Sequence, residues 1–244
     1  EAKQKSEFDT QNVTNKIESF NGFIITSHYS VDNDKAIIHF YGRLSNGKSF
    51  EVRTARKPYF FIKTSDAKKA NDLIGLNPES TNLATMNGEQ VSKITLDNPK
   101  NVPSFRKLLE DEDIACFEAD IPFTRRFFID EKIISQVTIS GEHTRGDRCD
   151  LLFIEPNITP LNKSEACVTP TLLSFDIETD AKATQIYSIS LHSKNTNKVI
   201  IVQNNTINQQ KEKLQHAHIV DNEKELLRTF IDSINGLDPD IITG

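Results

Sequence analysis

Several features that would place this chain in a familiar class are missing from its sequence. The apolar runs are all far shorter than a membrane-spanning helix, although a hydrophobic content of 36% with 15 Phe in 244 residues is enough to fill a globular core. No basic segment followed by an apolar one opens the chain, which begins at Glu1, so the sequence carries no mark of secretion. We therefore expect a soluble, cytoplasmic protein without a membrane partner, and a start that has been trimmed.

Cysteine and positive charge are also scarce. Cys116, Cys149 and Cys167 are far apart and lack the close-spaced Cys or His partners that bind zinc, so we predict reduced, structural thiols. The chain has 29 Lys and Arg against 35 Asp and Glu, and its formal net charge is −6. This balance disfavours a protein that coats phosphate backbones nonspecifically, but it allows one acidic metal site and one basic groove.

The glycine motifs of several enzyme classes are absent as well. The sequence contains no Gly-x-Ser-x-Gly, no Gly-Lys-Ser/Thr phosphate loop and no dinucleotide-binding fingerprint. Nucleotide hydrolases and dehydrogenases are therefore set aside.

The first half of the chain reads as strands separated by turns, with short helices. The segments GFIITSHYS (22–30) and KAIIHFYGRL (35–44) have strand character, and Asn46-Gly47 favours a hairpin because both residues tolerate positive φ. A helix is predicted over residues 67–74 with Gly75 at its end, and another within residues 101–113. This mixture predicts an α+β domain of mixed strands and short helices over residues 1–168.

A second unit is predicted to begin after a Pro-rich boundary at about residues 155–170. It contains three successive strand patterns, then a helix that Gly236 is expected to stop, and the start of a fourth strand in DPDIIT. This order is typical of α/β nucleases of the ribonuclease H-like type. We expect residues 169–244 to be the first, incomplete part of such a domain.

The segment SFDIETD (174–180) interrupts an apolar strand with two acids. Because residues two apart in a strand project to the same side, Asp176 and Glu178 share one face, whereas Phe175, Ile177 and Leu173 share the other and anchor the strand. Two adjacent carboxylates repel each other unless a cation lies between them, and Mg²⁺ or Mn²⁺ prefers such oxygen ligands. The pattern thus predicts metal-assisted phosphodiester hydrolysis, although a solvated pair of acids on an edge strand would have the same spacing.

The same segment resembles the first exonuclease motif of family B DNA polymerases, Asp-Ile-Glu-Thr on the first strand of the proofreading domain. Two further stretches, KPYFFIKTSD (57–66) and FEADIPFTRRFFIDEKI (117–133), are similar to the amino-terminal domain of that family and to the segment that precedes its exonuclease domain. The hairpin FYGRLSNGKSFEVR (40–53) looks like that of the bacterial member, DNA polymerase II. The motifs occur in the expected order and cover nearly the whole chain.

The resemblance implies a template-directed DNA polymerase with a 3′–5′ proofreading exonuclease, acting in DNA replication or repair. Asp176 and Glu178 would be catalytic and would bind two Mg²⁺ or Mn²⁺ ions. The partners would be primer-template DNA, its single-stranded 3′ end and dNTPs, with a sliding clamp as a further candidate. The family's other exonuclease carboxylates, from Asn-x-x-x-(Phe/Tyr)-Asp and Tyr-x-x-x-Asp motifs, are not found before Gly244. We therefore expect an amino-terminal fragment that is inactive by itself.

Two other functions remain open at this point. One is a stand-alone ribonuclease H-like 3′–5′ exonuclease fused to a β-rich domain, and the other is a noncatalytic nucleic-acid-binding module. The basic and aromatic segment around Arg56 and Tyr59 would suit single-strand binding, but an ordinary strand with a charged end explains it more simply.

Overall fold

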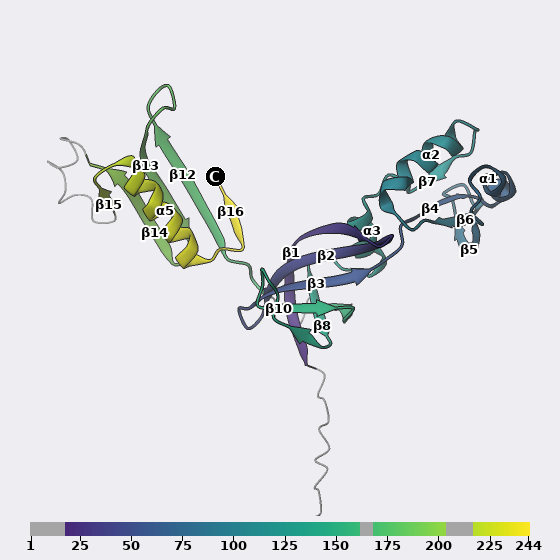
Figure 1. Ribbon diagram of the computed structural model, residues 1–244, viewed down its shortest axis with the longest axis horizontal. Coiled ribbons are helices and arrows are strands. Elements are labelled where there is room, and N and C mark those ends of the chain that lie inside the picture. Colours follow the sequence, from purple (N-terminus) through teal and green to yellow (C-terminus); the bar gives the residue numbers. More distant parts are fainter. Residues whose placement is uncertain (1–17, 162–167, 204–216) are drawn as a thin grey trace, which may run out of the picture.

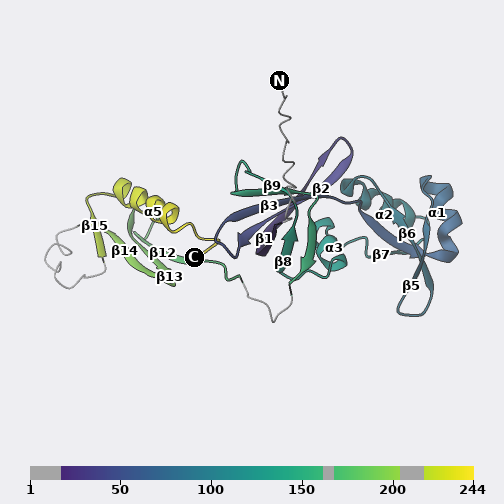
Figure 2. The same cartoon turned by 90° about the horizontal axis from the view of Figure 1, so that it is seen from below.

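The computed structural model describes residues 18–161, 168–203 and 217–244, and its strands form three sheets. The sheets lie in a row in two perpendicular views (Figures 1 and 2). Sheets dominate and helices are few, so the predicted α+β class is confirmed. Cys167 lies outside the described residues.

The central sheet has seven strands, in the order β11-β8-β1-β2-β3-β10-β9. Its strands are β1 (Ser19–Asp32), β2 (Lys35–Leu44), β3 (Ser49–Ala55), β8 (Gln136–Ser140), β9 (His143–Thr144), β10 (Leu151–Ile154) and β11 (Asn157–Pro160). The predicted hairpin is confirmed, because β2 and β3 pair antiparallel and Gly47 has a φ of 83° in the turn between them. The core of this sheet includes the fully buried Phe40, Phe50 and Phe153, and helix α3 (Phe123–Asp130) adds Phe127 to it.

A smaller sheet, in the order β5-β6-β4-β7, lies at one end of the row (Figure 1). Its strands are β4 (Tyr59–Lys63), β5 (Glu79–Ala84), β6 (Gln90–Thr95) and β7 (Cys116–Phe117), and it packs with α1 (Ala67–Ile74) and α2 (Val102–Glu110). Short 3₁₀ turns, η1 (Thr64–Asp66) and η2 (Pro99–Asn101), precede the two helices. The helix predicted over residues 67–74 is confirmed, and Gly75 ends it with a φ of 66°.

The third sheet, in the order β15-β14-β13-β12-β16, lies at the other end of the row. Its strands are β12 (Leu172–Thr179), β13 (Ile186–Ser193), β14 (Thr196–Val202), β15 (Ala217–Val220) and β16 (Ile241–Thr243). Strand β13 pairs antiparallel with both β12 and β14, while β15 pairs parallel with β14 and β16 pairs parallel with β12. Helix α5 (Glu223–Leu237) covers one face, where Leu226 packs against Leu173, Ile189 and Leu191.

Two details of this third sheet differ from the sequence-based expectation. Gly236 does not stop α5, which continues to Leu237 and ends where Asp238 takes a left-handed φ of 43°. Ile177 is not buried with Leu173, since 41% of its surface is exposed. The reason is that β16 pairs only with Leu172–Ser174, so within the described residues the rest of β12 has a neighbouring strand on one side alone.

The change from the central to the third sheet occurs between Pro160 and Leu172. No helix in the described parts of the chain is long and apolar enough to cross a membrane.

Candidate active site

Asp176 and Glu178 project from the second half of β12, on the face opposite α5. Their register partners on β13 are Ser190 and Ser188. Directly paired residues of an antiparallel ladder lie on the same face, so each carboxylate has a small hydroxyl residue beside it. Both acids are exposed. The alternation along the strand thus places the two carboxylates together on an open, polar surface.

The opposite face of β12 holds the strand in place. Leu173 is fully buried, and Phe175 packs against the same core with its ring centroid 5.4 Å from that of Phe230 in α5. These contacts fix the first half of the strand, while the acids extend beyond the residues that pair with β16. The packed first half of β12 therefore supports the exposed carboxylates of its second half.

The loop that follows the acids is closed by Asp180, which the sequence reasoning did not single out. Its carboxylate accepts hydrogen bonds from the Thr184 amide (2.6 Å) and hydroxyl (2.9 Å) and from the Gln185 amide (2.8 Å). The hydrogen bonds from Gln185 and Thr184 lower the pKa of Asp180. An Asp followed by polar residues at a turn is a local signal that could have identified this role. Asp180 fixes the loop directly after Glu178.

The oxygen donors of Asp176 and Glu178 suit a hard divalent cation, but two carboxylates are fewer ligands than such ions require. Within the described ranges, no group of three or more His, Cys, Asp or Glu side chains is placed to hold a metal ion. In the described part of the third sheet, the two carboxylates alone do not complete a metal site.

The basic and aromatic segment near Tyr59 is an ordinary strand, as the simpler explanation predicted. Phe60 and Phe61 are buried in β4. Tyr59 makes contacts within the fold as well: Lys93 Nζ lies 4.2 Å from the centroid of its ring, and its hydroxyl donates to Asp130 at 2.7 Å. Burial and this hydrogen bond raise the pKa of Tyr59 to about 12. These aromatic residues serve the fold and do not form a free stacking platform.

The remaining thiols also behave as predicted. Cys116 and Cys149 are free and partly buried among the described residues. Burial raises the pKa of Cys116 to about 11 and raises that of Cys149 as well. Both thiols therefore stay protonated at neutral pH and are structural.

Comparison with known proteins agrees with this arrangement. The model of the family B DNA polymerase exonuclease domain matches residues 114–244. The chain is 27% identical over 234 residues to a DNA polymerase of Methanocaldococcus jannaschii, covering 88% of this chain and 13% of that protein. It is 24% identical over 242 residues to a DNA polymerase of Pyrococcus glycovorans, covering 90% of this chain and 26% of that protein.

The fold has a counterpart among solved structures. The family B DNA polymerase of Pyrobaculum calidifontis superposes with a TM-score of 0.66 at 17% sequence identity, over 91% of this chain and 30% of that one. The chain thus spans roughly an eighth to a third of the proteins that it matches. These relatives are archaeal, so they support the family and leave the likeness to the bacterial member as a prediction. Because the exonuclease model covers more than half of its 244 residues, this chain belongs to the family B DNA polymerases.

Proposed function

We propose that the parent protein is a template-directed DNA polymerase with a 3′–5′ proofreading exonuclease, and that Asp176 and Glu178 are metal ligands of its editing site. The observation that carries this proposal is their placement. The two acids share the open face of the first strand of a sheet in an exonuclease-domain family member. The relatives also align over about nine-tenths of the chain, including the β-rich region before the motif. That coverage favours a polymerase over a stand-alone nuclease.

An exonuclease domain of this family implies the use of divalent metal ions, and the donors present fit Mg²⁺ or Mn²⁺ in part. Asp176 and Glu178 would each give carboxylate oxygens, and further ligands are needed. Bound metal ions of this kind stabilise the attacking water and the leaving oxygen of a phosphodiester. Leu173 and Phe175 anchor the strand, and Asp180 closes the loop after it, so the two acids are held in register.

Relatives named as DNA polymerases imply DNA as the macromolecular partner. The finer assignments form part of the proposal: primer-template DNA with a single-stranded 3′ end, dNTPs and a sliding clamp as partners, and a cytoplasmic location with a role in replication or repair. We also propose residues 1–168 as the amino-terminal domain and 169–244 as sequence of the exonuclease domain. The change of sheet between Pro160 and Leu172 supports that division.

Manganese titration of the chain, followed by electron paramagnetic resonance, tests the proposed site. We expect weak Mn²⁺ binding, with an affinity that Asp176→Asn or Glu178→Gln lowers by at least about tenfold. Removing a residue that only hydrogen-bonds to a metal ligand already lowers metal affinity by that much. Asp32→Asn and Asp34→Asn, at another exposed pair of acids two residues apart, serve as matched controls that leave binding unchanged. Equal binding by all four variants would refute the assignment.

The chain alone should show negligible hydrolysis of a single-stranded DNA 3′ end, because two carboxylates do not complete a two-metal site. A labelled oligonucleotide incubated with the chain and Mg²⁺ or Mn²⁺ measures this directly. Metal-dependent release of nucleotides that Asp176→Asn abolishes would show that the chain is active and that this expectation is wrong.

A further inference from the structure

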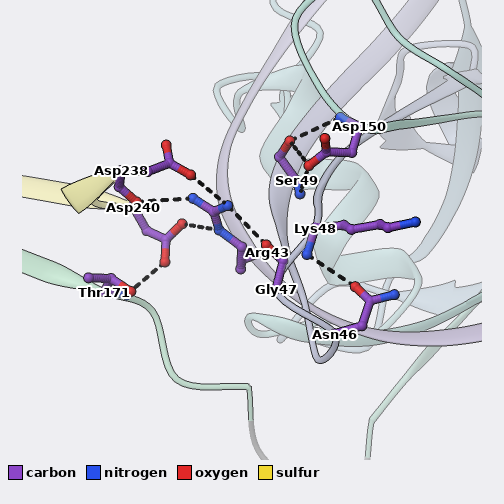
Figure 3. A network of polar contacts seen from close by, with 9 residues as sticks. All are labelled: Arg43, Asn46, Gly47, Lys48, Ser49, Asp150, Thr171, Asp238 and Asp240. Carbon is purple, nitrogen blue, oxygen red and sulfur yellow. Dashed lines mark hydrogen bonds and ion pairs between the residues drawn. The ribbon is translucent and has the colours of Figure 1, made fainter. Parts of the chain in front are cut away.

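The turn between β2 and β3 is held rigidly by its own hydrogen bonds. The Asn46 side chain accepts from the Lys48 amide at 3.1 Å, and Gly47 has the positive φ that the turn requires. Next to the turn, the carboxylate of Asp150 accepts from both the amide (2.8 Å) and the hydroxyl (2.9 Å) of Ser49. The hairpin end is therefore a fixed part of the central sheet (Figure 3).

Arg43 extends from this hairpin to the third sheet. Its Nε donates to Asp240 Oδ1 at 2.6 Å, and one Nη donates to Asp238 Oδ2 at 3.1 Å and to the Gly47 carbonyl at 3.1 Å. The other Nη donates to the Asp238 carbonyl at 3.3 Å. The side chain of Arg43 is 17% exposed and that of Asp240 only 2%. One guanidinium thus bridges residues almost 200 positions apart in the sequence.

Asp240 links Arg43 to the start of β12, the strand that carries Asp176 and Glu178. Its Oδ2 accepts from the Thr171 amide at 2.7 Å, and its own amide donates to the Thr171 carbonyl at 2.9 Å. The Ile241 amide donates to the same carbonyl at 3.1 Å. Thr171 precedes β12 and Ile241 begins β16, so Asp240 lies at the point where the two strands start side by side.

The electrostatics make this junction strong. A carboxylate that is almost fully buried is costly unless charge-assisted hydrogen bonds satisfy it, and a planar guanidinium can serve two carboxylates at once. Burial opposes the charge on Arg43, but the hydrogen bonds to Asp240 and Asp238 outweigh it and raise its pKa. Arg43 therefore carries its positive charge in the bridge at neutral pH.

We propose that Arg43 is a positioning residue that fixes the paired starts of β12 and β16 against the β2–β3 hairpin, and so orients the strand of Asp176 and Glu178 relative to the central sheet. The importance of that orientation for editing rests on the proposed function. The bridge itself rests on the contacts of Arg43, Asp240 and Thr171.

Amide hydrogen exchange in the 244-residue chain tests the bridge without any metal. In Arg43→Met, we expect the amides of Thr171, Asp240 and Ile241 to exchange about ten- to a hundredfold faster, the range expected for loss of hydrogen bonds to a charged group. Lys48→Met removes the same charge from the same hairpin, but its side chain points away from the two carboxylates, so these rates should not change (Figure 3). Arg43→Lys keeps the positive charge but lacks the planar guanidinium that can donate to two carboxylates, so the exchange rates of these amides should be intermediate.

The orientation is measured by the distance between spin labels on the two sheets, at the exposed Lys35 and Asn197. These labels are introduced in a variant whose native cysteines are replaced. We expect a narrow distance distribution that Arg43→Met broadens and Lys48→Met leaves unchanged. Unchanged exchange, or a distribution that stays narrow in Arg43→Met, would overturn the proposal. Failure of Asp176→Asn to alter Mn²⁺ binding would count against the proposed function alone, since neither readout here uses a metal.

Discussion

At the scale of single residues, Glu51 is the most heavily hydrogen-bonded acid on the central sheet. It is 3% exposed, and its carboxylate accepts from Arg53 Nε at 2.7 Å, from Tyr41 at 3.1 Å and from His39 Nδ1 at 2.9 Å. Burial alone would raise the pKa of Glu51, but the hydrogen bonds from Arg53, His39 and Tyr41 outweigh it and lower the pKa to about 2. The ionised carboxylate is therefore part of the folded structure.

This network predicts a specific dependence of stability on pH. Because the pKa of Glu51 is lower in the folded state than its ordinary value of 4.5, its contribution to stability is complete above pH 4.5 and is lost as the pH falls towards 2. We expect Glu51→Gln to lower the free energy of unfolding by about 1.5–3 kcal/mol at pH 7. The difference from wild type should shrink in urea unfolding at pH 3, because at that pH the Glu51 carboxyl of the unfolded chain is protonated while that of the folded chain is still mostly ionised.

A matched control is Glu131→Gln, which removes a half-exposed partner of Arg56 at 3.4 Å. Such pairs contribute about 0–1 kcal/mol, so its effect should be small at both pH values. A Glu51→Gln effect that is the same at pH 7 and pH 3 would contradict the role given to the carboxylate.

The sequence predicted the shared face of Asp176 and Glu178 because period-2 alternation is a local property. It could not predict the Glu51 network or the Arg43 bridge. The first depends on the register that places Tyr41 opposite Glu51 on another strand, and the second on a residue almost 200 positions away. The exposure of Ile177 was likewise missed, because it depends on how far β16 extends.

At the scale of elements, local signals sufficed for the β2–β3 hairpin and α1 but not for α3. The TRRFF run (124–128) is basic and aromatic, and it folds as a helix that buries Phe127 among the residues of the central core. Adjacent aromatic residues have no strong helix preference of their own. Here tertiary packing decides the structure.

Two glycines test how the helices end. Gly75 has a φ of 66° after α1, so Gly75→Ala should lower stability by about 1–2 kcal/mol. Gly236 lies inside α5, and a β-carbon added there would meet no described atom within 4 Å apart from its chain neighbours and the backbone of its own helix. Gly236→Ala should therefore raise stability by about 0.5–1 kcal/mol. Urea unfolding of both variants tests whether their changes in stability have opposite signs. A loss of stability in Gly236→Ala would instead support the helix stop predicted from the sequence.

At the scale of the whole molecule, the buried residues form separate clusters that share no side chain. One lies in the central sheet around Phe40, another under the small sheet around Phe60, and the third between α5 and the last sheet around Leu226. The third is joined to the central sheet by the segment from Pro160 to Leu172 and by the Arg43 bridge. Each cluster can therefore lose its packing without first disrupting another.

This separation predicts that the chain unfolds in more than one step. Leu226 is fully buried in the third cluster, so Leu226→Ala should destabilise the third sheet by about 2–5 kcal/mol. Phe40→Ala should do the same to the central sheet alone. Hydrogen exchange measured by segment in increasing urea separates the two, because β13 should respond to the first variant and β2 to the second. A single transition that both variants shift equally would show that the sheets unfold as one unit.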